Sequence, residues 1–277
     1  MEKSSSIFHF KRFDVVNERS AMKVNTDGVL LGAVMTLRPD DRRLLDIGTG
    51  TGTIALMVAQ RLTDMVCRSF AGAQDHKSDT QDARTVTSSE VESSPLCIDA
   101  IDIDEPSVTE AAKNFRNSPW PDVLHAHHAS LDDFATGLSD EIEKHKYDLI
   151  FSNPPYFDNA LQAPEQRRNA ARHTSTGLSY REILDFAAKN LSINGRVALV
   201  LPAETEHDLM RHARMNALYL YKITRVRTVS RKKPKLVIAE FSRLRTDVPQ
   251  DVVLTIQSGG QYTQEYLAVT KEFYLFA

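Results

Sequence analysis

The sequence feature that most constrains the fold is a glycine-rich turn between a short apolar strand and a helix. The strand covers residues 43–47 (RLLDI), the turn carries Gly48, Gly50 and Gly52, and a helix is expected over residues 53–61. Glycines let the backbone adopt left-handed conformations and approach a ligand closely, just before a helix N-terminus. Such a strand, turn and helix are typical of a parallel α/β sheet.

The alternation of strands and helices continues along the chain. Further strands are expected at 98–103, 122–129, 147–151, 195–201, 219–226, 236–241 and 252–256, and helices at 105–117, through the 130s and 140s, and at 180–191 and 204–217. Strands that alternate with helices form a mostly parallel sheet with helices on both faces. The sequence therefore predicts one α/β, Rossmann-like domain over residues 1–277.

One stretch, residues 63–95, departs from this pattern. It is rich in Ser, Thr and Asp and has no sustained hydrophobic period. Such a composition buries too little apolar surface to offset the entropy lost on ordering. We expect a mobile insertion on the surface; an ordered excursion is the alternative.

Composition argues against a disordered chain, a membrane-spanning protein and a cysteine-based metal site. Hydrophobic residues make up 42% and charged residues 26% of the 277 residues, and no apolar run approaches the length of a membrane span. The first residues are polar, and Cys67 and Cys97 lack a metal-ligand spacing. We expect a cytoplasmic protein without a metal, a membrane partner or an obligatory protein partner.

The glycine turn indicates the cofactor. A dinucleotide site would place a third glycine at position 53, where this chain has Thr53. The spacing G-x-G-x-G after Asp46 resembles motif I of class I S-adenosylmethionine-dependent methyltransferases. The resemblance implies S-adenosylmethionine as cofactor, held by Gly48, Gly50 and Gly52, with Asp46 near its ammonium group. A plain tight turn is the alternative.

A second acid is expected at the end of the next strand, where it can accept from both ribose hydroxyls. Asp102 lies 50 residues after Gly52, and without the 33 residues of the expected insertion that spacing is 17. Asp102 is therefore the predicted ribose ligand, and Ile103 can pack on the adenine ring. Asp104 is the alternative acid, better suited to cap the following helix.

The predicted catalytic motif is Asn153-Pro154-Pro155-Tyr156, at the end of a strand. The amide oxygen of Asn153 and the carbonyl of Pro154 can accept both N–H groups of a conjugated amine, and Tyr156 can stack on a planar base. The motif resembles the (N/D)-P-P-(Y/F/W) motif of amino-group methyltransferases. That motif serves adenine N6, guanine N2 and the side-chain amide of protein glutamine alike.

Three further segments narrow the family. Residues 19–33 (RSAMKVNTDGVLLGA), 117–120 (NSPW) and 272–276 (EFYLF) resemble the tRNA1(Val) adenine N6-methyltransferases, which modify the adenine next to the anticodon. The resemblance implies that Lys23, Thr26 and Asp27 line the cofactor or base entrance, although Thr26 or Asp27 could instead cap a helix. Where that family has an acid after the third strand, this chain has Ser130 as the candidate cofactor contact.

Basic residues indicate the surface for a tRNA partner. Residues 225–245 contain eight Lys or Arg and one acid, in a chain whose net charge is −3. We expect Arg231, Lys232, Lys233 and Lys235 to contact RNA phosphates, unless they form only a solvated hairpin. Arg167 and Arg168, which follow the catalytic motif, are further candidates for RNA contacts. The alternative is that they belong to a polar loop without that role.

Two other functions fit parts of the pattern. A protein-glutamine N5-methyltransferase acting on release factors is expected to have a separate N-terminal helical domain, for which the residues before 44 leave no room. A non-catalytic RNA-binding module would have no need for both the acid-flanked glycine turn and the NPPY motif. The sequence therefore favours methylation of an adenine amine in tRNA.

Overall fold

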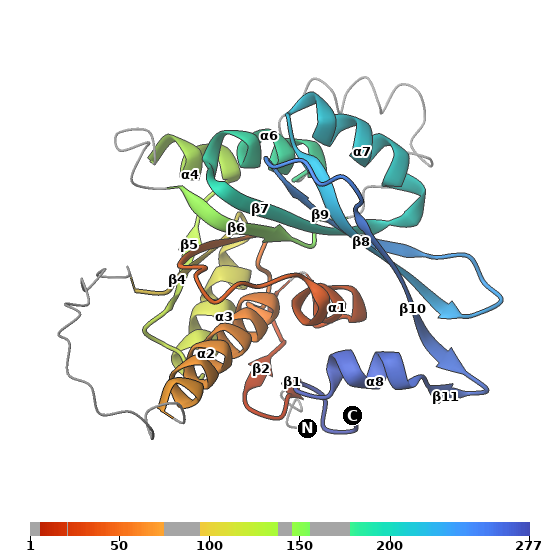
Figure 1. Ribbon diagram of the computed structural model, residues 1–277. Helices are drawn as coiled ribbons and strands as arrows, with labels where there is room; N and C mark the ends of the chain where they lie inside the picture. The colour runs from red at the N-terminus through yellow and green to blue at the C-terminus, as the bar shows by residue number, and fades with distance from the viewer. Residues whose placement is uncertain (1–5, 21, 75–94, 138–145, 156–177) are drawn as a thin grey trace, which may run out of the picture.

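The computed structural model describes residues 6–20, 22–74, 95–137, 146–155 and 178–277. A nine-stranded sheet forms its centre, in the order β11-β10-β8-β9-β7-β6-β3-β4-β5 (Figure 1). Its strands are β3 (Arg43–Ile47), β4 (Cys97–Asp102), β5 (Leu124–His128), β6 (Tyr147–Ser152), β7 (Leu191–Pro202), β8 (Tyr219–Val229), β9 (Leu236–Ser242), β10 (Gln250–Ser258) and β11 (Gln261–Tyr262).

The sheet is mostly parallel, as predicted. Strands β5, β4, β3, β6 and β7 pair in parallel, and β9 is antiparallel to both β7 and β8. Strand β10 pairs in parallel with β8, and β11 is antiparallel to β10. The carboxyl ends of β3, β4, β6 and β7 therefore lie along one edge of the sheet, where open α/β sheets bind ligands.

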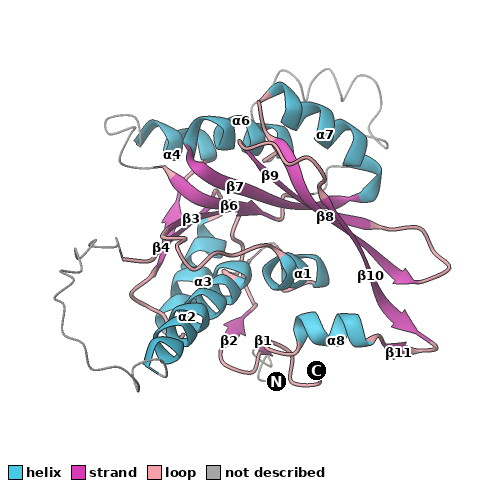
Figure 2. Ribbon diagram, viewed as in Figure 1, coloured by secondary structure: helices cyan, strands magenta, loops and turns pink. Residues whose placement is uncertain are grey.

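Helices cover both faces of the sheet (Figure 2). One face carries α1 (Thr26–Val34), α2 (Thr53–Gln74), α3 (Glu105–Arg116) and α8 (Gln264–Thr270), and the other carries α4 (Leu131–Gly137), α6 (Tyr180–Asn190) and α7 (Glu206–Met215), which follows a short 3-10 turn (Ala203–Thr205). A buried hydrophobic cluster fills each interface between sheet and helices. None of the described helices is both long and apolar enough to cross a bilayer.

Helix α2 is longer than the sequence pattern predicts. It continues past Arg61 to Gln74, so residues 63–74 do not belong to the expected insertion. Leu62 is buried and Met65 packs against the core. Asp64 forms an ion pair with Arg12 at 2.6 Å. These tertiary contacts stabilise a helical segment whose polar composition is typical of disorder. Residues 75–94 lie outside the described part of the chain.

Short elements near the two ends were not predicted. Strands β1 (Ile7–His9) and β2 (Asp14–Val16) form an antiparallel pair below α3, and the Asn114 amide of α3 bonds the backbone of Val16 through both its oxygen and its nitrogen. Helix α8 packs near them. Strands of three residues carry too little periodicity to be read from a sequence.

Candidate active site

The glycine turn after β3 has the backbone that the sequence predicts. Gly48, Gly50 and Gly52 have φ values of +72°, +56° and +81°, in the left-handed region that favours glycine. A Cβ atom on Gly52 would lie 2.4 Å from the Phe115 ring, so this glycine also permits close packing of α2 on α3. Both backbone shape and packing therefore require glycine at position 52.

This turn is attached to the end of β4. The backbone N–H groups of Gly48 and Thr49 donate to the carbonyl of Ile101, at 2.9 and 3.0 Å. The N–H of Gly50 donates to Oδ2 of Asp102 at 2.9 Å. The two loops predicted to hold the cofactor are thus one connected structure.

Asp46 is a buried carboxyl group beneath the turn. Its Oδ2 accepts from the Thr49 hydroxyl at 2.7 Å, while Oδ1 has no well-formed hydrogen bond among the described residues. Burial raises the pKa of Asp46 to about 7, against a smaller lowering by Thr49; Asp102 adds to the rise, and the nearby Ala55 backbone slightly lowers the pKa. A buried carboxyl with an oxygen that lacks a well-formed hydrogen bond favours a cationic ligand.

Asp102 and its neighbours form the second loop. Oδ1 of Asp102 accepts from the N–H of Asp104 at 2.9 Å, and burial raises the pKa of Asp102. Asp104 caps α3, because its side chain accepts from Ser107 N at 3.0 Å, as the sequence predicts for this residue. Ile103 has 71% of its surface exposed. Ser130 hydrogen-bonds to Asp133 at the start of α4.

A segment made of residues 17–20 and 22–25, here called the strap, crosses the glycine turn. The buried carboxylate of Glu110 on α3 accepts from the backbone N–H groups of Glu18 and Arg19, at 2.9 and 2.7 Å. A Cβ atom on Gly50 would meet the Ser20 hydroxyl at 3.4 Å and the Met22 carbonyl at 3.5 Å. The N-terminal signature segment therefore lies directly over the predicted cofactor loop.

The strap also reaches the predicted catalytic residue. Asn153, which is 5% exposed, directs its Nδ2 to Oδ1 of Asn25 at 3.4 Å and to Sδ of Met22 at 3.6 Å. Oδ1 of Asn25 also accepts from the N–H of Gly28 at 2.8 Å. Because a backbone N–H can only donate, this bond fixes the amide orientation of Asn25, and Asn153 must turn its NH2 toward it.

The structure places the remaining predicted residues as follows. The Nζ of Lys23 donates to the carbonyls of Asn17 and Glu18, both at 2.7 Å, within the strap. Thr26 and Asp27 are the first residues of α1, and the helix cap is Asn25, so the alternative that either of them caps this helix is wrong. Pro154 is buried directly after Asn153. Tyr156, Arg167 and Arg168 lie outside the described residues.

The sequence reasoning missed Asn25, Met22 and Glu110. Asn25 stands three residues before Gly28 at the start of an apolar helix, which is the spacing of an N-cap, so this signal was present. Glu110 is an isolated acid on the buried side of an amphipathic helix, and no sequence rule says which backbone it will hold.

Residues 230–235 of the basic segment 225–245 form the connection between β8 and β9. Arg231, Lys232, Lys233 and Lys235 are exposed and form no ion pair within the described part of the chain, whereas Arg225 of β8 pairs with Glu206 and Asp251. Glu240, the single acid of the segment, is buried and lies 3.0 Å from Lys222. The positive charge of the connection is therefore not offset locally.

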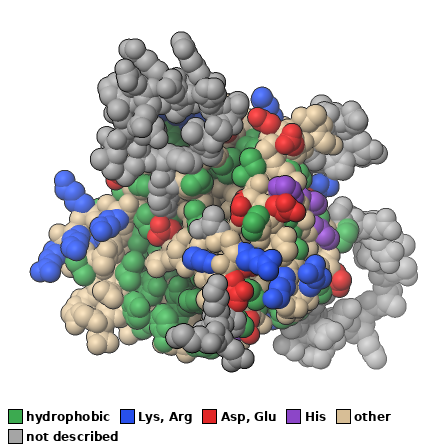
Figure 3. Space-filling model, turned by 180° about the vertical axis from the view of Figure 1, so that it is seen from behind, with side chains coloured by type: hydrophobic (Ala, Val, Ile, Leu, Met, Phe, Trp, Pro, Cys, Tyr) green, Lys and Arg blue, Asp and Glu red, His purple; other side chains and the backbone are tan. Residues whose placement is uncertain are grey.

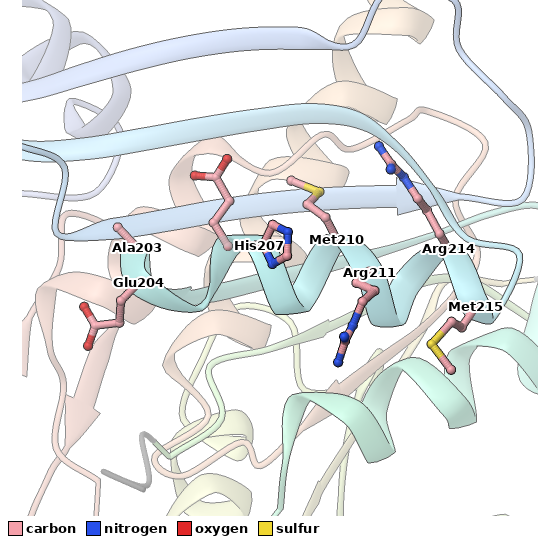
Figure 4. Close-up of a pocket in the computed structure, with 8 residues that line it drawn as sticks. Ala203, Glu204, His207, Met210, Arg211, Arg214 and Met215 are labelled. Carbon is pink, nitrogen blue, oxygen red and sulfur yellow. The ribbon is translucent and has the colours of Figure 1, made fainter. Parts of the chain in front are cut away.

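Other polar groups lie away from this site. A hollow of about 780 Å³ runs along α7 and is lined by Ala203, Glu204, Glu206, His207, Met210, Arg211, Arg214 and Met215 (Figure 4). It shares no residue with the predicted site. His127 hydrogen-bonds to Asp99 at 2.9 Å and His128 to the Ile103 carbonyl at 3.0 Å, so both imidazoles hold neighbouring backbone and side chains in place.

Comparison with known proteins identifies the class of this fold and site. Residues 35–232 match a family model described as an RMKL-like methyltransferase domain. A predicted O-methyltransferase from Agrobacterium tumefaciens superposes with a TM-score of 0.57 at 12% identity, over 89% of this chain and 96% of that one, which supports the fold alone. The chain is a class I methyltransferase, a class that uses S-adenosylmethionine.

The relatives define the family more narrowly. A protein from Flavobacterium psychrophilum named tRNA1(Val) (adenine(37)-N6)-methyltransferase is 36% identical over 97% of this chain and 99% of its own length. One of the same name from Parabacteroides distasonis is also 36% identical, over 97% of each chain. The chain belongs to the tRNA1(Val) (adenine(37)-N6)-methyltransferase family.

Proposed function

We propose that this protein transfers the methyl group of S-adenosylmethionine to the N6 amine of the adenine next to the anticodon in tRNA1(Val). The observation that carries the proposal is the position of Asn153 at the carboxyl end of β6, next to the glycine turn of β3. The Ser152 hydroxyl bonds the Ile47 carbonyl at 2.6 Å, so the two loops begin side by side. A tRNA substrate also implies that the enzyme works in the cytoplasm.

The residues around the turn fit the cofactor. Its ammonium group is matched by the buried Asp46, whose Oδ1 has no well-formed hydrogen bond among the described residues. The carboxylate of Asp102, held by two backbone N–H groups, faces the same turn and would accept from the ribose hydroxyls. Exposed Ile103 would cover one face of the adenine ring, and Ser130 would lie near its edge.

The strap residues have different proposed roles. Thr26 and Asp27 begin α1 directly after Asn25, and we assign their side chains to contact with the cofactor or the target base. The ammonium group of Lys23 donates hydrogen bonds to the carbonyls of Asn17 and Glu18 within the strap. We therefore propose that Lys23 holds the strap over the glycine turn and supports cofactor binding indirectly, through the position of the strap.

The chemistry follows from the acceptors near Asn153. When bound, the cofactor would supply an electrophilic methyl group on a sulfonium and leave as the neutral thioether, while the proton displaced from the amine would be released to solvent. An aromatic amine is a weak nucleophile because its lone pair is delocalised into the ring. The Oδ1 of Asn153 and the carbonyl of Pro154 would accept its two N–H groups and stabilise the positive charge that develops on nitrogen. Tyr156 would hold the base by stacking.

The RNA is proposed to contact the basic connection between β8 and β9. Arg231, Lys232, Lys233 and Lys235 are exposed there without offsetting acids among the described residues. Phosphate contacts of this kind position RNA without reading its bases. Arg167 and Arg168 are further candidates from outside the described residues.

The test is methyl transfer from labelled S-adenosylmethionine to purified tRNA1(Val) that lacks the modification. We expect one N6-methyladenosine, located next to the anticodon by mass mapping of nuclease fragments. A transcript with guanine in place of that adenine is the matched control and should accept no label. Transfer to a release factor instead of tRNA would contradict the proposal.

A further inference from the structure

The strand register brings distant segments to the edge of the sheet that carries Asn153. Ser152 at the end of β6 pairs with Leu199 of β7, and Pro202 of β7 pairs with Leu236, the first residue of β9. Leu236 also pairs with Val226 of β8. The connection between β8 and β9 therefore leaves the sheet at the edge of the proposed active site.

The turn between β10 and β11 leaves the sheet at the same edge. Gln257 of β10 pairs with Val229 of β8, and it also pairs with Tyr262 of β11. Neighbouring strands lie about 4.8 Å apart, and β11 is the second strand from β8. The Cα atom of Tyr262 therefore lies about 10 Å from that of Val229, the last residue before the basic connection. In Figure 1 both turns lie at the right of the view, the β10–β11 turn below the connection between β8 and β9.

Tyr262 belongs to a ladder of stacked aromatic rings, here called the aromatic ladder. Its ring stacks on Phe276, with centroids 5.2 Å apart and planes 16° from parallel, and Phe276 stacks on Tyr274 at 4.8 Å and 22°. Tyr262 also stacks on Tyr266 at 5.0 Å. Tyr266 and Tyr274 are buried, so they anchor the ladder to the core.

The two middle rings of the ladder are the exposed ones. Tyr262 is 41% exposed and Phe276 57% exposed. Exposed, preorganised aromatic rings beside positive charge are the arrangement with which proteins bind unpaired bases: rings stack on bases while Lys and Arg contact phosphates. Seen from behind, Lys and Arg side chains gather at one edge of the molecule, next to hydrophobic side chains (Figure 3).

We propose that Tyr262 and Phe276 form a stacking platform for an unpaired base of the RNA substrate, while Arg231, Lys232, Lys233 and Lys235 contact the adjoining phosphates. The inference rests on the proposed tRNA substrate and adds a second point of attachment along the sheet edge, away from Asn153. Recognition of single-stranded loops commonly uses aromatic stacking, which tolerates any base.

Binding of an anticodon stem-loop RNA, measured by fluorescence anisotropy at several salt concentrations, tests the platform. The double variant Tyr262→Ala, Phe276→Ala should raise the Kd about tenfold or more. Because stacking neutralises no phosphate, the slope of log Kd against log salt should not change. The triple variant Lys232→Ala, Lys233→Ala, Lys235→Ala should instead flatten that slope by up to about two to three units.

Controls separate stacking from packing. Tyr262→Phe keeps the ring and should bind as wild type, and Phe276→Leu keeps apolar bulk but loses the ring and should bind more weakly. Cofactor affinity and melting temperature of each variant report folding. If wild type methylates the tRNA and the Phe276→Leu variant binds RNA with unchanged Kd, the platform is refuted while the proposed function stands. If wild type neither binds nor methylates tRNA, the proposed function itself fails.

Discussion

Asn25 and Asn153 share a hydrogen bond in which one oxygen serves two purposes. Oδ1 of Asn25 caps α1 by accepting from Gly28 N at 2.8 Å and also accepts from Nδ2 of Asn153 at 3.4 Å. The strap thereby sets the orientation of the amide that is proposed to accept from the target amine. A helix cap and a catalytic geometry are coupled through one side chain.

Substitutions of Asn25 can separate these two purposes. Serine is a good N-cap but is too short to reach Asn153, so Asn25→Ser should keep the melting temperature and lower kcat roughly tenfold or more. Asn25→Asp keeps an acceptor for both partners and should stay near wild type. Asn25→Ala should lose kcat and about 1 kcal/mol of folding stability. Normal kcat in the serine variant would show that Asn25 only caps the helix.

Asn153→Ala tests the catalytic amide itself. Removal of a hydrogen-bond acceptor that acts on the transition state costs about a hundredfold in rate, or roughly 3 kcal/mol. Cofactor affinity, measured by calorimetry, should change by no more than a few-fold, because Asn153 is assigned to the substrate. Asn153→Asp retains an acceptor and should keep more activity than alanine. Near-normal turnover of the alanine variant would remove Asn153 from the mechanism.

Sequence reasoning found the parts of the site that lie on regular elements. The glycine turn, the acid at the end of β4 and the end of β6 follow from strand and helix periodicity, because parallel strands end at one edge. The strap could not be placed in this way. Its position depends on hydrogen bonds that Glu110 accepts from backbone N–H groups about 90 positions away, which no local pattern encodes. The extension of α2 to Gln74 depends likewise on packing and on Arg12.

Gly52→Ala tests the close packing of α2 and α3. The new Cβ would lie 2.4 Å from the Phe115 ring, at a residue with φ of +81°. Overpacking together with the left-handed backbone should cost about 2 kcal/mol or more of folding stability. Gly137→Ala is the matched control, because a Cβ there meets no atom of the described residues within 4 Å. Chemical denaturation measures both; equal stabilities would contradict the assigned packing.

Two deletions test where the insertion begins. Replacing residues 75–94 by a linker of about twelve Gly and Ser residues should change folding stability by less than about 1 kcal/mol, because loop length acts weakly on stability. Replacing residues 63–94 should destabilise more, since it removes Asp64 and Met65. Equal effects of the two deletions would show that residues 63–74 contribute nothing to the fold.

Asp46 predicts a pH dependence in the cofactor-free protein. Its pKa lies at about 7 in the folded state, against 3.8 as an ordinary carboxyl, because burial disfavours the charged form. Between these values the folded chain holds a proton that the unfolded chain has released. The stability that this group contributes is therefore complete below about pH 4 and is lost as the pH rises through about 7.

Asp46→Asn should remove this dependence. Wild type should lose up to about 4 kcal/mol more stability than the variant between pH 4 and pH 8, measured by denaturant unfolding without cofactor. Cofactor affinity should instead increase as the pH rises, because the cofactor's ammonium group requires the ionised carboxylate. Wild-type Kd should rise as the pH falls below 7, by up to about tenfold per pH unit, while the variant should bind weakly at every pH. A variant that binds S-adenosylmethionine as tightly as wild type at pH 8 would exclude Asp46 from the cofactor site.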